Sequence, residues 1–92
     1  MTGSTRSEDD IVVRGLLAEN YLNDVDFMSF FEESKALIAE AIVNTLPEHT
    51  KSREKLYFTH EGINQVLGTM VAYVEAKDQV IAKRDAEELK DD

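Results

Sequence analysis

A repeat of mostly apolar side chains in the second half of the chain limits its fold most strongly. From Leu56 onward these residues recur at alternating steps of four and three, and Val66, Tyr73 and Val80 widen the stripe. The repeat positions are Leu56, His60, Ile63, Leu67, Met70, Val74, Lys77 and Ile81. This spacing predicts a helix over about residues 53–88 that pairs with an antiparallel helix. The apolar arc covers about half of the helix circumference, which is more than a simple two-stranded coiled coil needs.

A second helix is predicted over about residues 24–46, with Asp24 as its N-cap. Its apolar face recurs at steps of three and four residues, the spacing of a helix. The positions on that face are Phe27, Phe30, Phe31, Ser34, Leu37, Ile38, Ala41, Ile42 and Thr45. Pro47, the only proline, ends this helix because the residue before a proline is driven out of the helical region. The polar residues that follow Pro47 therefore form the turn of a helical hairpin.

A shorter helix is predicted over about residues 8–22, where Ser7 and three acidic residues form a favourable N-terminus. Gly15 opposes this helix, since a glycine inside a helix costs about 1 kcal/mol. Residues 1–6 have no apolar anchor and are predicted to be disordered. The acidic end, about residues 85–92, is predicted to fray into solvent.

The lengths of these helices predict how they pack. The third helix would be about 54 Å long and the second about 33 Å, so the second covers only part of its partner. The first helix is then expected to cover the remainder, around Val74, Val80 and Ile81. We therefore predict a single all-α domain over residues 1–92, a helical hairpin with a shorter N-terminal helix in a three-helix arrangement. The apolar arcs exceed what such a small fold buries, which favours self-association or docking onto another protein.

Composition excludes several classes of function. The chain has 92 residues, 19 acidic and 10 basic side chains and a net charge of −9, which disfavours direct binding to nucleic acid. Only the stretch with Lys51, Arg53 and Lys55 is locally positive. No cysteine is present, so disulfides and thiolate metal sites are excluded. No secretory signal pattern and no apolar run of about 20 residues occur, so we expect a soluble, cytoplasmic protein without membrane contact.

No motif for catalysis or for binding a metal or cofactor is complete. His60 and Glu61 match the start of the zinc-protease helix motif, but Asn64 stands where the second histidine is required. We interpret His60 as a half-buried residue that closes the loop end of the hairpin. No serine or threonine lies in a glycine-rich nucleophile elbow, and the glycines are isolated. The sequence therefore predicts a protein that is not an enzyme and has no cofactor.

Several residues are candidates for a protein interface. Gly68, Ala72 and Ala76 follow one another at four-residue steps opposite the apolar seam, so a helix could approach that face closely. The alternative for the alanines is that they are good helix formers. Tyr57 and Phe58 form an aromatic cluster beside basic residues, for which packing under the loop is the alternative.

Phe31 and Tyr73 complete the candidate interface. They lie on the apolar arcs of the second and third helices.

The chain resembles small helical proteins encoded by tailed bacteriophages. The similarity covers roughly residues 16–74 and rests on the stretches LLAENYLNDVDFMSFFEE and NTLPEHTKSREKLYF, followed by a long final helix. The final helix is more acidic toward its end than in that group and lacks a Gly-Lys pair expected there. The resemblance implies a phage-encoded accessory or virion-assembly role in the host cytoplasm or the virion. It carries over no catalytic residues.

Two functional hypotheses follow. The first is a non-enzymatic interaction or assembly module that buries apolar helix surface against copies of itself, as a homo-oligomer, or against another phage or host protein. The alternative is an acidic inhibitor that mimics nucleic acid and occupies a basic host protein. Binding of the second kind would weaken steeply as the salt concentration rises.

Overall fold

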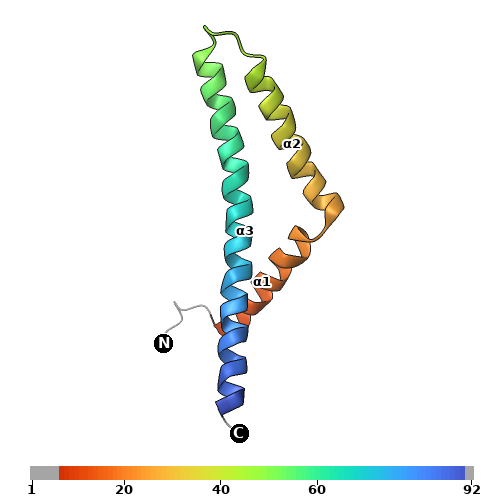
Figure 1. Ribbon diagram of the computed structural model, residues 1–92, viewed down its shortest axis with the longest axis vertical. Coiled ribbons are helices and arrows are strands. Elements are labelled where there is room, and N and C mark those ends of the chain that lie inside the picture. Colours follow the sequence, from red (N-terminus) through yellow and green to blue (C-terminus); the bar gives the residue numbers. More distant parts are fainter. Residues whose placement is uncertain (1–6, 91–92) are drawn as a thin grey trace. The chain divides into compact units, whose positions relative to one another are not determined.

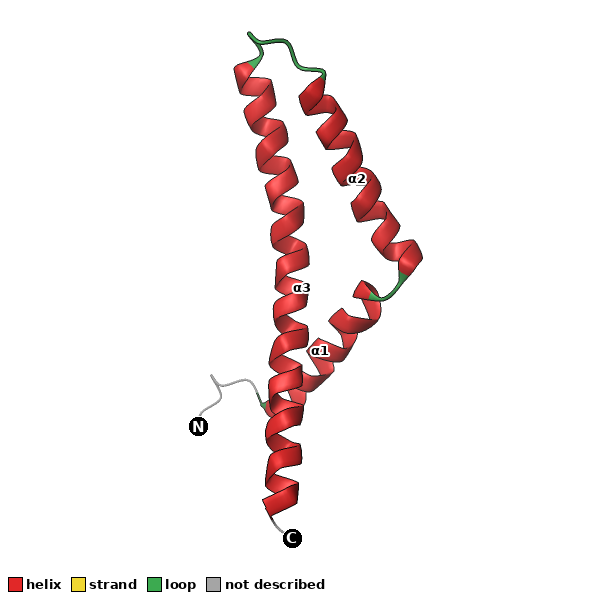
Figure 2. Cartoon of the chain, in the orientation of Figure 1, coloured by secondary structure: helices red, strands yellow, loops and turns green. Residues whose placement is uncertain are grey.

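The computed structural model describes residues 7–90, and this part of the chain is built from three helices without a strand (Figures 1 and 2). Helix α1 spans Glu8–Leu22, α2 spans Val25–Val43 and α3 spans Thr50–Lys90. The prediction of an all-α fold with three helices is therefore confirmed. The predicted disorder of residues 1–6 lies outside the described residues.

The first two helices begin at the caps that the sequence predicts. The Ser7 hydroxyl accepts a hydrogen bond from the Asp10 backbone N–H at 3.1 Å. The Asp24 carboxylate accepts one from the Phe27 N–H at 3.0 Å. Each bond satisfies a backbone donor that has no partner within its helix.

The break between α1 and α2 depends on one backbone angle. Asn23 still has a helical conformation, with φ −91° and ψ −5°. Asp24 has a ψ of 105°, which is extended, and α2 resumes at Val25. No residue with positive φ occurs in the described part of the chain, so the break needs no glycine.

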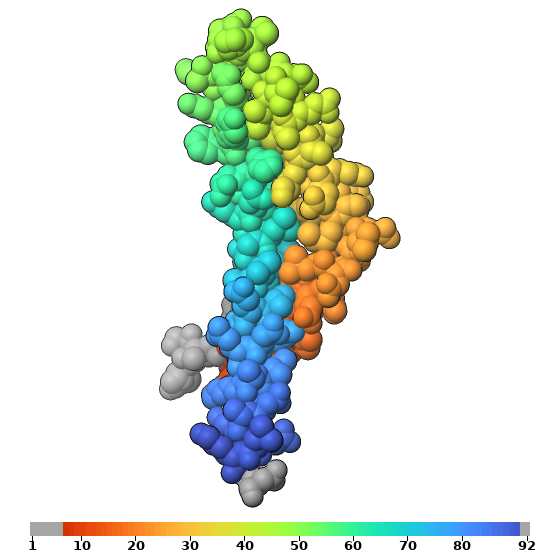
Figure 3. Space-filling view, in the orientation of Figure 1, coloured from red at the N-terminus to blue at the C-terminus, as the bar shows by residue number. Residues whose placement is uncertain are grey.

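The chain divides into two compact units, and α3 contributes to both. We call residues 24–68 the hairpin unit, because it contains α2 and the first part of α3. We call the described residues up to Asn23 and from Thr69 onward the terminal unit, which pairs α1 with the second part of α3. Figure 3 shows the side chains of each pair in direct contact.

The hairpin turn differs by a few residues from the predicted bounds. Helix α2 ends at Val43 rather than near residue 46, because both the hydroxyl and the N–H of Thr45 bond to the Ile42 carbonyl, at 2.7 and 3.2 Å. Helix α3 begins at Thr50 rather than near residue 53. The Arg53 N–H donates to the His49 carbonyl at 3.1 Å, which starts the helix earlier.

The acidic end of α3 remains helical in the structure. Residues 85–90, for which the sequence predicts fraying, belong to the helix and are exposed, and residues 91–92 lie outside the described part.

Very little of the described chain is fully buried. Among its apolar side chains only Ala18, 6% exposed, reaches full burial. The predicted seam of the hairpin unit, represented by Leu56, Ile63 and Leu67, is half-buried. Phe27 and Phe31 pack edge to face, with ring centroids 5.3 Å apart. The seam along which α2 meets the first part of α3 is therefore only half-buried.

Replacing the α2 cap should measure its contribution to stability. Asp24→Ala removes the acceptor for the Phe27 N–H and should lower the free energy of unfolding by about 1 kcal/mol. Asp24→Asn keeps an acceptor at this position and should lie close to wild type. Urea unfolding followed by circular dichroism at 222 nm gives both values, and equal stability of the two variants would contradict a capping role.

Candidate interaction surfaces

The hairpin unit exposes large apolar side chains on both of its helices. Phe30 and Leu37 of α2 are each 67% exposed, and Phe58 of α3 is 74% exposed. The full set in this unit is Val25, Phe30, Leu37, Val43, Leu46, Tyr57, Phe58 and Val66. A surface with this many large apolar groups is typical of a protein that binds a partner.

One stripe of α2 has the spacing of a coiled-coil seam. Phe30, Ser34, Leu37 and Ala41 follow one another at steps of four, three and four residues. They therefore lie along one side of the helix. The first three are exposed, and Ala41 is half-buried. We call these four residues the α2 stripe.

An apolar groove lies at the loop end of the hairpin unit. Ala39, Ile42 and Val43 from α2 and Tyr57 and His60 from α3 line a hollow of about 300 Å³.

The sequence interpretation of His60 agrees with its place at this groove. The residue is half-buried, and its Nδ1 lies 3.4 Å from Asn64 Nδ2. A partner side chain that entered the groove would meet mainly carbon atoms and one imidazole ring.

The structure places the predicted interface residues in different surroundings. Tyr57 and Phe58 are exposed, whereas Phe31 is half-buried against Phe27. Gly68 is exposed, and a Cβ added there would meet no atom within 4 Å. No part of the described chain therefore approaches Gly68, and a close contact there remains a prediction about a partner.

The remaining predicted residues belong to the terminal unit. Ala72 is exposed and Ala76 is half-buried. Tyr73 is half-buried, and the Arg14 guanidinium lies 5.5 Å from the centre of its ring. This distance permits a cation–π interaction that joins α1 to α3.

A close approach between two helices occurs at Gly15 of α1, which packs on α3. A Cβ added to Gly15 would overlap the Lys77 side chain and would lie 2.7 Å from the Tyr73 carbonyl oxygen. Gly15 is itself buried. The absence of a side chain at this position is what allows α1 to rest on the α3 backbone.

Lys77 lies beneath this contact and is the only charged residue of the described chain that is buried, at 5% exposure. Its ammonium donates to both carboxylate oxygens of Glu19 at 3.0 Å and pairs with Asp78 Oδ1 at 3.0 Å. A buried ammonium requires such partners, because an unpaired charge is poorly solvated by protein.

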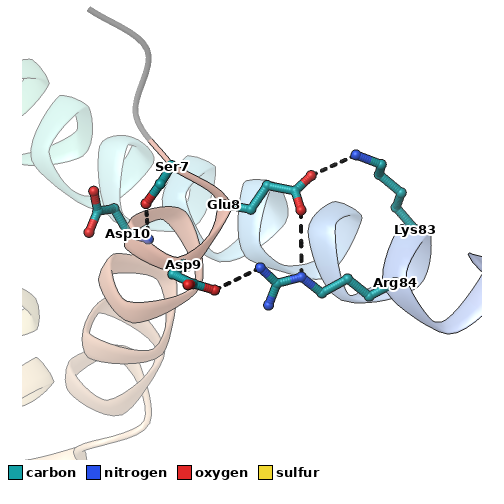
Figure 4. Close-up of polar contacts among 6 residues, drawn as sticks. All are labelled: Ser7, Glu8, Asp9, Asp10, Lys83 and Arg84. Atoms are coloured by element: carbon teal, nitrogen blue, oxygen red, sulfur yellow. Dashed lines mark hydrogen bonds and ion pairs between the residues drawn. The ribbon is translucent and has the colours of Figure 1, made fainter. Parts of the chain in front are cut away.

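A second group of ion pairs joins the start of α1 to α3 (Figure 4). Lys83 Nζ lies 2.7 Å from Glu8 Oε2. The Arg84 guanidinium lies 2.8 Å from Asp9 Oδ1 and 3.6 Å from Glu8 Oε1. These side chains are partly or largely exposed, so salt in the solvent screens their attraction.

These pairs shift the titration of the groups involved. The hydrogen bond from Lys83, with its positive charge, lowers the pKa of the Glu8 carboxyl from its ordinary value of 4.5. Hydrogen bonds to Glu19 and Asp78 raise the pKa of Lys77 above its ordinary 10.5. The bond to Glu8 likewise raises the pKa of Lys83. The charged forms of these groups are therefore the ones that the folded terminal unit favours.

The sequence pattern does not reveal the Gly15–Lys77 contact. Gly15 counted only as a cost to its helix, and Lys77 was one member of a mostly apolar repeat. A polar residue at a seam position was the available signal, since a buried lysine needs an acidic partner on the facing helix.

Comparison with known proteins gives no assignment. No family model, no curated protein and no solved structure matches the chain.

Two kinds of feature are absent from the described residues, a metal-binding cluster and a membrane-spanning helix. No group of three or more histidine, cysteine, aspartate or glutamate residues is placed to hold a metal ion there. None of the helices over residues 7–90 combines the length and apolar character needed to cross a membrane.

The pKa of Glu8 gives a test of the ion pairs. Because this pKa is lowered on folding, the stabilisation is complete above the unfolded value near 4.5 and is lost as the pH falls through the folded pKa. A carboxyl titration by NMR should show Glu8 titrating below 4.5, and Lys83→Gln should move it back toward that value. Lys35→Gln removes a charge from the other unit and should leave the Glu8 titration unchanged; an equal effect of both variants would contradict the assignment.

Two glycine substitutions should have opposite effects on stability. Gly62→Ala meets no atom within 4 Å and should raise the free energy of unfolding by about 1 kcal/mol, the gain in helix propensity. Gly15→Ala has the same gain, but its Cβ overlaps α3 and overpacking of this kind costs about 1–3 kcal/mol. Urea unfolding should therefore place Gly15→Ala below Gly62→Ala, and equal stabilisation by both would show that α1 does not rest on Lys77.

Proposed function

We propose that this protein is a non-enzymatic assembly module that associates with a second copy of itself through the apolar surface of the hairpin unit. The observation that carries this proposal is the contrast in burial within the described chain. In the hairpin unit no side chain is fully buried, while eight large apolar side chains are exposed. Such a surface favours removal from water by a protein partner.

The size of the hairpin unit supports a second copy as the partner. A unit of residues 24–68 is small enough that natural proteins usually stabilise it with disulfides, a metal or oligomerisation. The chain has no cysteine, so disulfides cannot serve here. Two hairpins packed face to face would form four helices around a shared core, an arrangement known to be stable.

The exposed area is sufficient for such an interface. Phe30, Tyr57 and Phe58 are each more than half exposed and together present on the order of 400 Å². The five aliphatic residues exposed in the same unit add to this area. A stable interface covers about 800 Å² on each partner. The α2 stripe supplies the regular spacing that paired helices need.

The resemblance to small helical phage proteins supports a biological setting for this activity. We propose that the protein is phage-encoded and acts in virion assembly, in the host cytoplasm or in the virion. Assembly by apolar burial requires no catalytic residue.

Sedimentation equilibrium over a concentration series tests self-association directly. Wild type should form a dimer or larger oligomer, and salt should strengthen it, because residues 24–68 carry four basic and eight acidic side chains and two copies repel each other. The double variant Phe30→Ser with Leu37→Ser should shift the protein toward monomer. Leu89→Ser, which changes a residue 76% exposed in the terminal unit, is the matched control and should associate like wild type.

Two results would contradict the proposal. One is a wild-type protein that stays monomeric at the highest concentration reached. The other is a loss of association that is equal in the α2 variant and the Leu89 control. A monomer that binds a basic host protein, with affinity that falls steeply as salt rises, would instead support mimicry of nucleic acid.

A further inference from the structure

We propose that α1 is a releasable latch on α3, held by charge pairs and a close glycine contact, and that rising ionic strength frees it while the hairpin unit stays folded. By latch we mean Glu8–Leu22 together with its contacts to the terminal part of α3. The release of α1 is argued from contacts of the terminal unit alone, while the persistence of the hairpin unit rests on the self-association proposed above, which sedimentation tests separately.

The interface beneath α1 contains little apolar surface. Ala18 is the only side chain of α1 that is fully buried, and Ile11 and Val12 are half-buried. Leu17 and Tyr21 lie at the edge of a small hollow and remain exposed. Regions with few buried apolar contacts open at low free-energy cost. Helix α2 has no fully buried residue, so what distinguishes α1 is the set of ion pairs that join it to α3.

Charged groups supply much of the remaining contact. From α1, Glu8, Asp9 and Glu19 face basic residues of α3. From α3, Lys77, Lys83 and Arg84 face these carboxylates.

Three further charged groups act in the same region. Asp78 forms an ion pair with Lys77, and the Arg14 guanidinium lies over the Tyr73 ring. The negative charge of Glu87 attracts the Lys83 ammonium. Screening therefore weakens mainly the exposed pairs of Glu8 and Asp9 with Lys83 and Arg84, whereas the pair of Glu19 with buried Lys77 is screened much less.

The Gly15 contact fixes the position in which the latch closes. Because Gly15 has no side chain, α1 approaches the Tyr73 carbonyl and the Lys77 side chain closely. It thereby covers the aliphatic part of the lysine. Release would return the Lys77 ammonium to water, where it needs no carboxylate partner.

A released α1 should also lose its helix. It has 15 residues, and isolated helices of about 12–15 residues are marginal in water. Opening of the latch is therefore an order-to-disorder change in one segment. It would uncover Ala18 on α1 and Tyr73 on α3.

Hydrogen exchange of the full chain, read by mass spectrometry peptide by peptide, tests the latch. At 1 M NaCl the Debye length is about 3 Å, compared with about 10 Å at 0.1 M. Wild-type amides within Glu8–Leu22 should then exchange about tenfold faster, while those of α2 keep their protection. Lys83→Gln with Arg84→Gln should give the same fast exchange already at 0.1 M.

Matched variants separate the latch from a general loss of stability. Lys51→Gln with Lys55→Gln removes the same charge from the hairpin unit and should leave α1 exchange as in wild type. Gly15→Ala should open α1 at either salt concentration, and Gly62→Ala should not.

Three results would overturn the proposal. The first is α1 exchange that salt does not change. The second is α1 and α2 exchange that rise by the same factor. The third is an α1 exchange rate that the Lys83→Gln, Arg84→Gln variant and the Lys51→Gln, Lys55→Gln variant raise equally. Each would show that α1 is not released separately by charge screening.

Discussion

The pairing of the Lys77 ammonium with Glu19 and Asp78 is the interaction on which the terminal unit depends. A lysine at a helix–helix seam would ordinarily keep the two helices apart, since its charge needs water. Here Gly15 brings α1 close enough to cover the aliphatic stem of Lys77, and Glu19, one helical turn further along α1, takes the place of the water. The two residues depend on each other, because the close approach buries the charge and the carboxylate makes that burial tolerable.

Local features of the fold follow from the sequence, and this tertiary contact does not. Ser7 and Asp24 cap their helices as predicted, since capping needs only a polar side chain and a backbone donor three residues away. The turn at Pro47 is local in the same sense. The helix ends on either side of it differ from the predicted ones by about three residues. The Gly15–Lys77 contact joins residues 62 positions apart, so no local pattern could specify it.

The candidate surface of the hairpin unit was partly accessible from the sequence. Tyr57 and Phe58 were identified as an aromatic cluster, and the structure leaves both exposed. Phe30 and Leu37 appeared only as members of a broad apolar face, because periodicity gives the direction of a side chain but not which part of an arc the neighbouring helix covers. Phe31 is half-buried and packs on Phe27, whereas Phe30 is exposed, a difference that periodicity alone does not give.

The junction at Asp24 means that only a short interruption separates α1 from α2. Asn23 lies at the edge of the helical region and Asp24 leaves it mainly through ψ, so the interruption of the helix is confined to these two residues. The cap that opposes a continuous helix there contributes about 1 kcal/mol, little more than the thermal energy. A binding partner that favours a longer helix would have to supply at least this local free energy, together with the cost of moving the segments that pack on α3.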